Sequence, residues 1–386
     1  MKRMLLAAGL CLAAASGRAE DTIKVGLIAP FSGPFADYGK EMQTGIKAYQ
    51  KVHGDKVAGK RIEVIVRDTT GPVPEVARRL AQELVVRDHV DFLAGFGLTP
   101  EALAVADVAT QSKKPMIIMN AATSIITTKS PYIARVSMTL PQIATPLGTW
   151  AAKNGIGTVF TMVSDYGPGI DAETAFKKSF TAAGGQVVDS VRVPLKNPDF
   201  SPFLQRIKDA KPQAVFVFVP AGEQGIAFMK GFQERGLKDA GIKVIATGDL
   251  TDENVLDAMG DVALGMITAF HYSTAHDSPE NKTFLEAAEG VGTGVHRPNF
   301  MAVAAYDGMA AIARVVQQLH GKVDGDGAMK ALEGWKWQSP RGPVEIDPAT
   351  RDIDQTVYLR RVEKRGDHLD NVEFDKFPDV KDPGKS

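Results

Sequence analysis

A regular alternation of short apolar segments with amphipathic segments constrains the fold of this chain more than any other feature. Residues 23–29 and 214–219 are nearly continuous apolar runs of strand length. Between such runs, apolar residues recur at helical spacing, as Val76, Leu80 and Leu84 do at i, i+4 and i+8. Strands that are apolar on both sides need helices over both faces of their sheet. The pattern therefore predicts an α/β fold built on parallel sheets.

The same criteria give a full set of predicted elements. Predicted strands lie at 23–29, 61–67, 90–94, 115–119, 158–163, 186–193, 214–219 and 242–247. Predicted helices contain 42–49, 76–84, 101–111, 141–154, 171–183, 200–210, 223–235 and 252–259. These elements fall into two successive runs, which meet between 119 and 141.

Two runs and the chain length together predict two doubly wound lobes. A chain of 386 residues exceeds what one hydrophobic core usually supports. In each lobe, ligand-binding loops belong at the carboxyl ends of the parallel strands. A long alanine-rich helix is predicted at 299–320, and strands at 335–347 and 356–362. These three segments are interpreted as returns to the two lobes rather than as a third domain.

The amino terminus has the layout of a secretory signal peptide. Lys2 and Arg3 precede an apolar run over 4–15, which is too short to span a bilayer ~30 Å thick. Small residues then precede a polar segment, so we expect residues 1–19 to be removed by cleavage near Ala19. The alternative is an apolar terminal helix of the mature fold.

Export has consequences for the chemistry of the mature chain. Cys11 is the only cysteine and leaves with the signal peptide, so no disulfide, thiolate metal site or cysteine nucleophile is expected. Leu10 is too large for a lipoprotein cleavage site, which argues against a lipid anchor. Loss of Lys2, Arg3 and Arg18 leaves 42 basic and 46 acidic residues, a net charge of −4. A mildly acidic chain lacks the basic surface that nucleic-acid binding needs, so no nucleic-acid partner is expected.

Motifs of nucleotide-binding and catalytic α/β proteins are absent from the sequence. The turn at 30–34 reads Pro-Phe-Ser-Gly-Pro instead of Gly-x-Gly-x-x-Gly, and neither a P-loop nor a Gly-x-Ser-x-Gly nucleophile elbow occurs. The closest histidines, His271 and His276, have no carboxylate at metal-ligand spacing, and both are expected in loops or on the surface.

Two pairs of aspartates could act as acid–base pairs, Asp165 with Asp171 and Asp249 with Asp252. Each pair lies near the predicted start of a helix, where capping a helix or tightening a loop is the favoured role. We therefore predict no catalytic residue, no metal and no cofactor, and we do not expect an enzyme.

Six predicted strand-to-helix loops are rich in small, hydroxyl and aromatic residues. A helix start carries roughly half a positive charge, so such loops can hold a carboxylate without an arginine. Aromatic side chains would flank the apolar body of the ligand. The alternative is that all six are only tight α/β turns. The loops are 31–34 with Tyr38, 95–99, 121–124, 165–169, 220–223 and 248–251.

Short motifs follow one another in a specific order along the whole mature chain. They are Ile-Lys-Val-Gly-Leu-Ile-Ala-Pro-Phe-Ser-Gly-Pro at 23–34, Tyr38-Gly39, Asp68, Ala121-Ala122-Thr123, Asp165-Tyr166-Gly167, Pro198-Asp199-Phe200 and the helix with Tyr306. In order and spacing they resemble the periplasmic binding proteins of the branched-chain amino acid (Leu/Ile/Val) ABC transporter family. No single motif is decisive.

The resemblance implies a fold and a cellular role. The fold is α/β, a type I periplasmic binding protein with two doubly wound parallel-sheet lobes joined by three crossover segments, near 141, 270 and 340–355. The role is to trap a ligand in the periplasm and deliver it to an inner-membrane ABC permease. The lobe assignments that follow are 20–141 plus 271–345 for lobe 1 and 142–270 plus 346–386 for lobe 2.

The resemblance also implies a ligand site at the strand-end loops. The family's carboxylate site would fall on Thr99, Ala121 and Thr123, with Tyr38 and Tyr166 as aromatic walls. The full set of predicted ligand-binding residues is Phe31, Tyr38, Phe96, Gly97, Thr99, Ala121, Ala122, Thr123, Asp165, Tyr166, Ala221 and Asp249.

Two departures from the family pattern bear on the ligand. Amino-acid binders of the family hold the ligand's ammonium with a tyrosine and a glutamate of the second lobe. Here the loop at 219–222 has no tyrosine, and the loop at 247–250 offers only Asp249, which is one carbon shorter. The motifs at 31–32, 95–97 and 220–222 are more similar to the branch of the family that binds small aromatic carboxylates, such as hydroxybenzoates and phenylpropenoids.

We therefore predict a non-catalytic binding protein that delivers a small carboxylate, an aromatic acid, to an ABC permease. A branched-chain or other amino acid is the alternative ligand. An envelope α/β enzyme such as a hydrolase is the alternative from another class, and the missing nucleophile and metal spacing count against it. A ligand-binding regulator of the same fold would need a DNA-binding segment where this chain has a signal peptide.

Overall fold

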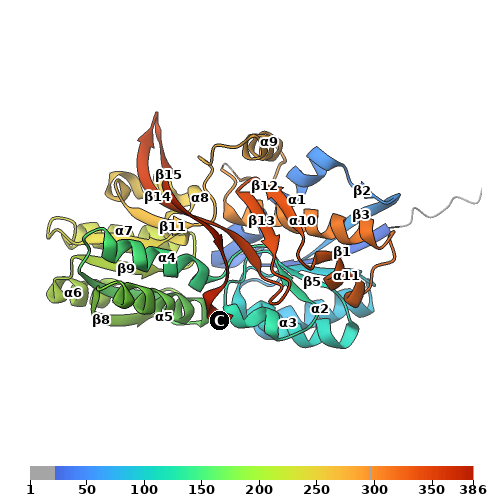
Figure 1. Cartoon of the computed structure of the whole chain (residues 1–386), viewed down its shortest axis with the longest axis horizontal. Helices are drawn as coiled ribbons and strands as arrows, with labels where there is room; N and C mark the ends of the chain where they lie inside the picture. The colour runs from blue at the N-terminus through green and yellow to red at the C-terminus, as the bar shows by residue number, and fades with distance from the viewer. Residues whose placement is uncertain (1–21, 296, 386) are drawn as a thin grey trace, which may run out of the picture.

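Two sheets, each covered by helices on both faces, form two lobes that lie side by side (Figure 1). The computed structural model describes residues 22–295 and 297–385. The predicted signal peptide, its cleavage site and Cys11 therefore lie outside the described residues. Within the described part of the chain, every helix is too short or too polar to cross a membrane.

The first lobe carries the amino-terminal strand; its segments from the start of the chain are blue to cyan in Figure 1, and its later helices are gold to orange. Its strands are β1 (Thr22–Ala29), β2 (Lys56–Val57), β3 (Lys60–Asp68), β4 (Phe92–Gly95), β5 (Met116–Ile118) and β6 (Ile133–Arg135). Its helices are α1 (Ala36–His53), α2 (Pro74–Val86), α3 (Thr99–Ser112), α9 (Pro279–Ala288), α10 (Phe300–Gln318) and α11 (Gly325–Leu332). The strand order is β2-β3-β1-β4-β5-β6, and only β2 runs antiparallel to its neighbour.

The side chains of β1 show why residues 25–29 of this strand are apolar. Val25 and Leu27 pack into a core that α1, α10 and α11 share, whereas Ile28 packs on the other face with α2 and α3. Successive side chains of a strand point to opposite faces, so a sheet covered on both faces buries all of them.

The second lobe holds the longer sheet; its segments before residue 271 are green to yellow in Figure 1, and its carboxyl-terminal strands are orange to red. Its strands are β7 (Thr158–Ser164), β8 (Gln186–Val193), β9 (Ala214–Phe218), β10 (Lys243–Thr247), β11 (Ile267–Phe270), β12 (Lys336–Ser339), β13 (Gly342–Ile346), β14 (Ile353–Arg365) and β15 (His368–Val380). Its helices are α4 (Leu140–Lys153), α5 (Gly167–Ala182), α6 (Ser201–Ala210), α7 (Glu223–Glu234) and α8 (Glu253–Met259). The order is β12-β13-β14-β11-β10-β9-β7-β8, with β15 paired to β14.

Alternating burial also explains strand β9. Val215 and Val217 pack toward α6 and α7, whereas Phe216 and Phe218 pack toward α4 and α5. The ring of Phe216 stacks on Phe176 of α5 with centroids 4.0 Å apart. Helices on both faces therefore fix β9 in the centre of its sheet.

The chain passes between the lobes three times: from β6 to α4, from β11 to α9, and through β12–β14. The predicted type I fold with two lobes and three crossovers is confirmed. The third passage is shared, because β13 hydrogen-bonds to β14 of the second sheet while Val344 and Ile346 pack in the core of the first lobe. The predicted lobe divisions at 141, 270 and 345 stay predictions.

The carboxyl-terminal third departs from the predicted elements. The strand predicted at 335–347 is a hairpin, in which β12 and β13 are joined at Pro340-Arg341. The strand predicted at 356–362 is the longer β14, and its partner β15 was not predicted. Because β14 is antiparallel to β11, the second sheet is mixed rather than wholly parallel. The short elements β6 and β11 and the helices α9 and α11 were also missed.

Candidate ligand-binding site

The strand-end loops of the two lobes face each other and touch. Tyr38 of α1 donates a hydrogen bond from its Oη to the carbonyl oxygen of Ala221, after β9, at 3.4 Å. Gly167 begins α5 and lies against Thr123 of the first lobe, since a Cβ at Gly167 would be 2.5 Å from Thr123 Oγ1. A pocket lined by Tyr38, Ala221 and Asn299 lies at the same boundary. The structure thus brings the predicted loops of both lobes together in a closed arrangement.

Thr99 and Thr123 form a pair of buried hydroxyls at this boundary. Their Oγ1 atoms are 3.1 Å apart, and the residues are 3% and 7% exposed. Each hydroxyl carries one proton, so when one donates to the other, one O–H group is left for a further acceptor. Thr99 is the first residue of α3, and Thr123 lies beside Gly167 at the start of α5. Two helix amino termini converge here, which favours a negatively charged group.

Glu101 already occupies part of the amino terminus of α3. Its carboxyl group accepts hydrogen bonds from the backbone N–H of Leu98, at 2.8 Å, and from the hydroxyl of Thr69. Burial raises the pKa of Glu101 to about 8, although these hydrogen bonds lower it. The backbone N–H groups after β4 are therefore not all bare, which corrects the expectation drawn from the small residues of this loop.

Tyr38 and Tyr166 provide two aromatic rings between the lobes. Tyr166 precedes α5, and its ring stacks on Phe218 with centroids 6.1 Å apart. Burial raises the pKa of both phenols, and the charge of Asp249 raises each of them further. The structure therefore groups the two predicted tyrosines with Asp249, and both rings stay neutral near pH 7.

Asp249 has neighbours that compensate its charge. Its carboxylate accepts a hydrogen bond from Thr247 Oγ1 at 2.8 Å. Burial raises the pKa of Asp249 to about 6, while the Arg360 guanidinium opposes this rise. Arg360 is fully buried and donates to the carbonyl oxygen of Tyr272 at 2.6 Å. A second cation next to Asp249 would be repelled by Arg360.

The structure places two predicted site residues away from this group. Phe96 adopts a φ of +66° and packs in the core with α2 and α3, whereas Tyr38 packs in a different cluster. The position of Phe96 does not support its predicted contact with a ligand ring. Asp165 is exposed and lies 3.9 Å from Arg192, so its side chain is occupied at the surface.

The remaining predicted residues surround the site with backbone or small side chains. A Cβ at Gly97 would lie 2.9 Å from Pro30 and 3.2 Å from the ring of Tyr38, so only glycine fits there without a shift. Ala122 packs in the same cluster as Tyr38, and Ala121 in the core of the first lobe. The ring of Phe31 lies against α1, since a Cβ at Gly39 would be 2.5 Å from it. Phe31 packs against the core of the first lobe.

A buried polar cluster that sequence reasoning missed links the lobes on one side of the site. Glu41 of α1 accepts hydrogen bonds from Asn254 of α8 and from the backbone N–H of Asn299, the latter at 3.1 Å. Asn299 Nδ2 in turn donates to both carboxylate oxygens of Asp252, at 3.0 and 3.1 Å. Asp252 also caps α8, as predicted for it. No local sequence signal marks this cluster, because Glu41 lies more than 200 residues from its partners Asn254 and Asn299.

His271 is a second residue that sequence reasoning misplaced. His271 lies in the loop that directly follows β11, as predicted, but it is not a surface residue, since it is 0% exposed. His276 is half-buried instead, with its Nδ1 2.9 Å from a carboxylate oxygen of Glu373. The apolar run at 266–270 was the available signal, because it marks a buried strand that delivers the next residue to the carboxyl edge of the sheet.

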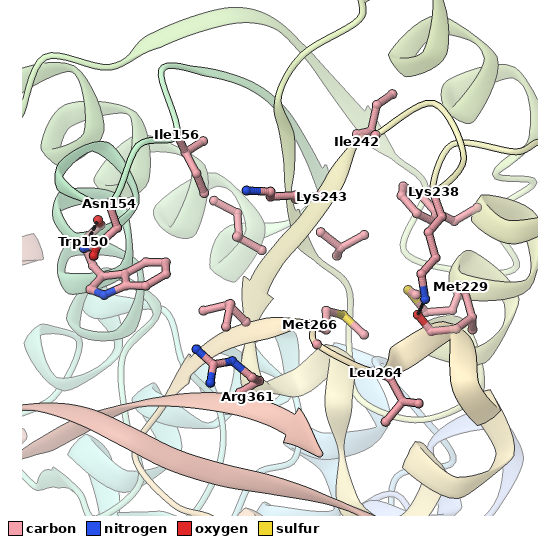
Figure 2. A pocket seen from close by; sticks show the side chains of 17 residues that line it. Trp150, Asn154, Ile156, Met229, Lys238, Ile242, Lys243, Leu264, Met266 and Arg361 are labelled. Carbon is pink, nitrogen blue, oxygen red and sulfur yellow. Dashed lines mark hydrogen bonds between the residues drawn. The ribbon is translucent and has the colours of Figure 1, made fainter. Parts of the chain in front are cut away.

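A separate pocket of about 510 Å³ lies in the second lobe (Figure 2). Lys243 and Ile267 line it and are the first residues of β10 and β11. The pocket is therefore at the amino ends of these strands, the opposite edge from Asp249. Figure 2 shows Trp150 and Arg361 on its side nearer α4 and β14.

A family model for periplasmic binding proteins matches residues 22–367. The chain belongs to the periplasmic binding protein family. This periplasmic binding protein is 48% identical over 386 residues to Leu/Ile/Val-binding protein homolog 6 of Brucella melitensis, a match that covers 100% of this chain and 99% of the relative. The family predicted from the order of the motifs is thus confirmed.

Two solved structures are similar to this periplasmic binding protein over nearly their full length. One is a solute-binding protein of an ABC transporter from Rhodopseudomonas palustris BisB5 in complex with 3,4-dihydroxybenzoic acid, with a TM-score of 0.92, 56% identity, and coverage of 95% of this chain and 100% of the other. The other, from Rhodopseudomonas palustris HaA2, is in complex with p-hydroxybenzoic acid, with a TM-score of 0.92, 47% identity, and coverage of 94% and 99%.

Proposed function

We propose that this periplasmic binding protein is exported, captures a small aromatic carboxylate between its lobes and delivers it to an inner-membrane ABC permease. The observation that carries the proposal is the buried pair Thr99 and Thr123, which faces the start of α5 from the other lobe. The hydroxybenzoate complexes of the two Rhodopseudomonas palustris proteins support it. Cleavage near Ala19 and lobe divisions at 141, 270 and 345 belong to the same proposal.

Binding uses contacts from both lobes, and so it favours the closed form. The ligand carboxylate accepts hydrogen bonds from Thr99 and Thr123, and the helix ends beside them add a favourable field. Tyr38 and Tyr166 pack on the aromatic ring from the first and the second lobe. Micromolar affinity requires only ~8 kcal/mol, which a few charge-assisted hydrogen bonds and one buried ring can supply.

An amino acid fits this site less well. A buried ammonium needs an acidic or aromatic partner, and Asp249 is the acidic side chain of the second-lobe loops that lies near the two tyrosines. The Arg360 guanidinium already interacts with Asp249 and repels a further cation. A plain aryl carboxylate carries no such group and avoids the cost.

A thermal-shift panel tests the ligand class. Hydroxybenzoates and benzoate are expected to raise the melting temperature more than leucine, isoleucine or valine do. A ligand that binds only the folded, closed form stabilises it by RT ln(1 + [L]/Kd), about 2.7 kcal/mol at a hundredfold excess over Kd. Stabilisation by leucine without stabilisation by any aromatic acid would reverse the assignment and make Asp249 the ammonium partner.

Affinity is expected to rise as the pH falls from about 8 to about 6. In the closed form burial raises the pKa of Glu41, and burial with the charge of Glu253 raises the pKa of Asp252 to about 7. The charge of Asp249 raises the pKa of Asp252 further. Arg360 is the nearby cation, and it interacts with both aspartates. Carboxyl groups with raised pKa values bind protons on closure, so closure is favoured below these pKa values and weakened as the pH rises through them. Each linked proton changes Kd up to about tenfold per pH unit.

Titration calorimetry with 4-hydroxybenzoate at the two pH values measures this linkage. Glu41→Gln removes one of the linked protons and is expected to flatten the dependence of Kd on pH. Asp107→Asn is the control, because Asp107 is exposed on α3 of the same lobe and pairs with Arg78 at 3.5 Å. An equal pH dependence in the wild type and in Glu41→Gln would contradict the role of the buried acid cluster.

A further inference from the structure

His271 is a buried histidine with an unused hydrogen-bonding capacity. It directly follows β11, is 0% exposed, and neither Nδ1 nor Nε2 has a hydrogen-bond partner among residues 22–295 and 297–385. Its ring lies 4.6 Å from that of Phe270 and 6.0 Å from that of Phe300, which offer no polar partner. A buried polar group without a partner costs about 1–3 kcal/mol, so its retention calls for an explanation.

The topology places His271 at the ligand-facing edge of the second lobe. β11 runs parallel to β10, with Ala269 opposite Thr247, so His271 emerges at the same edge as Asp249. Phe300, its ring neighbour, follows Asn299, which lines the pocket between the lobes. The Thr99 and Thr123 hydroxyls lie on the other lobe.

Other polar atoms at this edge are also unused. Ser164 Oγ, at the end of β7, and Asn120 Oδ1, two residues after β5, are buried and have no hydrogen-bond partner in the described chain. Asn120 is held in place by its Nδ2, which donates to the carbonyl oxygen of Gly97 at 2.7 Å. Unpaired polar atoms at the carboxyl ends of strands in both sheets leave hydrogen-bonding capacity at the edge where α/β folds of this kind bind their ligands.

The charge state of His271 suits a hydroxyl group. Burial, together with the positive charges of Arg341 and Arg360, lowers the pKa of His271 well below its ordinary value. The neutral imidazole has one N–H donor and one acceptor nitrogen. A phenolic hydroxyl also donates once and accepts, whereas a carboxylate only accepts.

We propose that His271 is a specificity-determining residue that hydrogen-bonds the ring hydroxyl of a hydroxylated aromatic carboxylate, while Thr99 and Thr123 hold its carboxylate. The inference rests on the proposed function and adds a subclass of ligand to it. Sites that hydrogen-bond a substrate hydroxyl discriminate strongly against the analogue that lacks it, because their polar groups are then left unpaired.

The test compares 4-hydroxybenzoate with benzoate in the wild type and in His271→Phe by titration calorimetry. The wild type is expected to bind 4-hydroxybenzoate at least about tenfold more tightly than benzoate. In His271→Phe this ratio is expected to fall to between about one and three, with the Kd for benzoate within about threefold of the wild-type value. The ligand-free variant is expected to melt at the same or a higher temperature, since an apolar ring replaces two unpaired nitrogens among phenylalanines.

His276→Phe is the matched control, because His276 already has a carboxylate partner in Glu373. This variant is expected to leave the ratio of the two Kd values unchanged. A preserved preference for 4-hydroxybenzoate in His271→Phe would overturn the inference, and so would equal losses for both ligands. If neither acid binds the wild type, the proposed function itself fails.

A second measurement does not depend on the folding of the variant. In the ¹⁵N NMR spectrum of the wild type, the imidazole nitrogens of His271 are expected to shift on addition of 4-hydroxybenzoate and much less on addition of benzoate. Identical shifts with both acids would also overturn the inference.

Discussion

Arg341→Met is expected to lower the free energy of unfolding by about 3–5 kcal/mol, because it leaves a buried carboxylate without its cation. Arg341 Nη2 lies 3.0 Å from Asp307 Oδ2, and both side chains are essentially inaccessible to solvent. The guanidinium also donates to the carbonyl oxygens of Val136 and Ser137, the latter at 3.2 Å. Arg341 thus joins the third crossover to the first one and to α10, and urea or thermal unfolding measures what this junction contributes.

Two further variants test whether the loss of stability comes from burial of the Arg341–Asp307 pair. Arg79→Met removes an exposed arginine that lies 2.7 Å from Glu83, and it is expected to change stability by less than about 0.5 kcal/mol. The double variant Arg341→Met/Asp307→Leu is expected to recover part of the loss, since no charge is then left buried alone. Equal losses in Arg341→Met and Arg79→Met would show that burial of the pair is not the cause.

Thr99→Val and Thr123→Val are each expected to weaken binding of an aromatic carboxylate roughly ten- to a hundredfold. Valine keeps the shape of threonine but removes the hydroxyl, and a hydrogen bond to a charged group is worth ~1.5–3 kcal/mol. The two Oγ1 atoms are in contact at 3.1 Å, so the loss in the double variant is expected to differ from the sum of the single losses. Titration calorimetry with 4-hydroxybenzoate gives each Kd.

Thr174→Val is the matched control for these variants. Thr174 lies on the exposed side of α5, where its hydroxyl donates to the carbonyl oxygen of Ile170 at 2.7 Å. This variant is expected to bind ligand as the wild type does. Unchanged affinity in both Thr99→Val and Thr123→Val would place the carboxylate elsewhere, and a large loss of thermal stability in either would indicate a structural role instead.

Local periodicity was sufficient to predict most of the elements and the site edge. The strand predicted at 186–193 is β8 residue for residue, and the helix predicted at 223–235 is α7 to within one residue. The carboxyl ends of parallel strands share one edge, which is why Thr99 and Thr123 could be grouped before their contact was known. Family resemblance supplied their role, since strand order alone does not select a ligand.

Tertiary structure determined which polar groups are buried and which of them have partners. His271 lies in the loop after β11 and Arg341 in the turn between β12 and β13, yet both side chains are inaccessible. The pairing of Arg341 with Asp307, and of Glu41 with Asn254 across 213 residues, depends on how the crossovers and lobes pack. The spacing of apolar residues in a segment predicts that they are buried. A charged side chain, in contrast, is buried only where a distant segment supplies its partner. The sequence by itself therefore determined the two α/β lobes and the edge at which they meet, and only the packed chain decided which polar atoms there have partners and which do not.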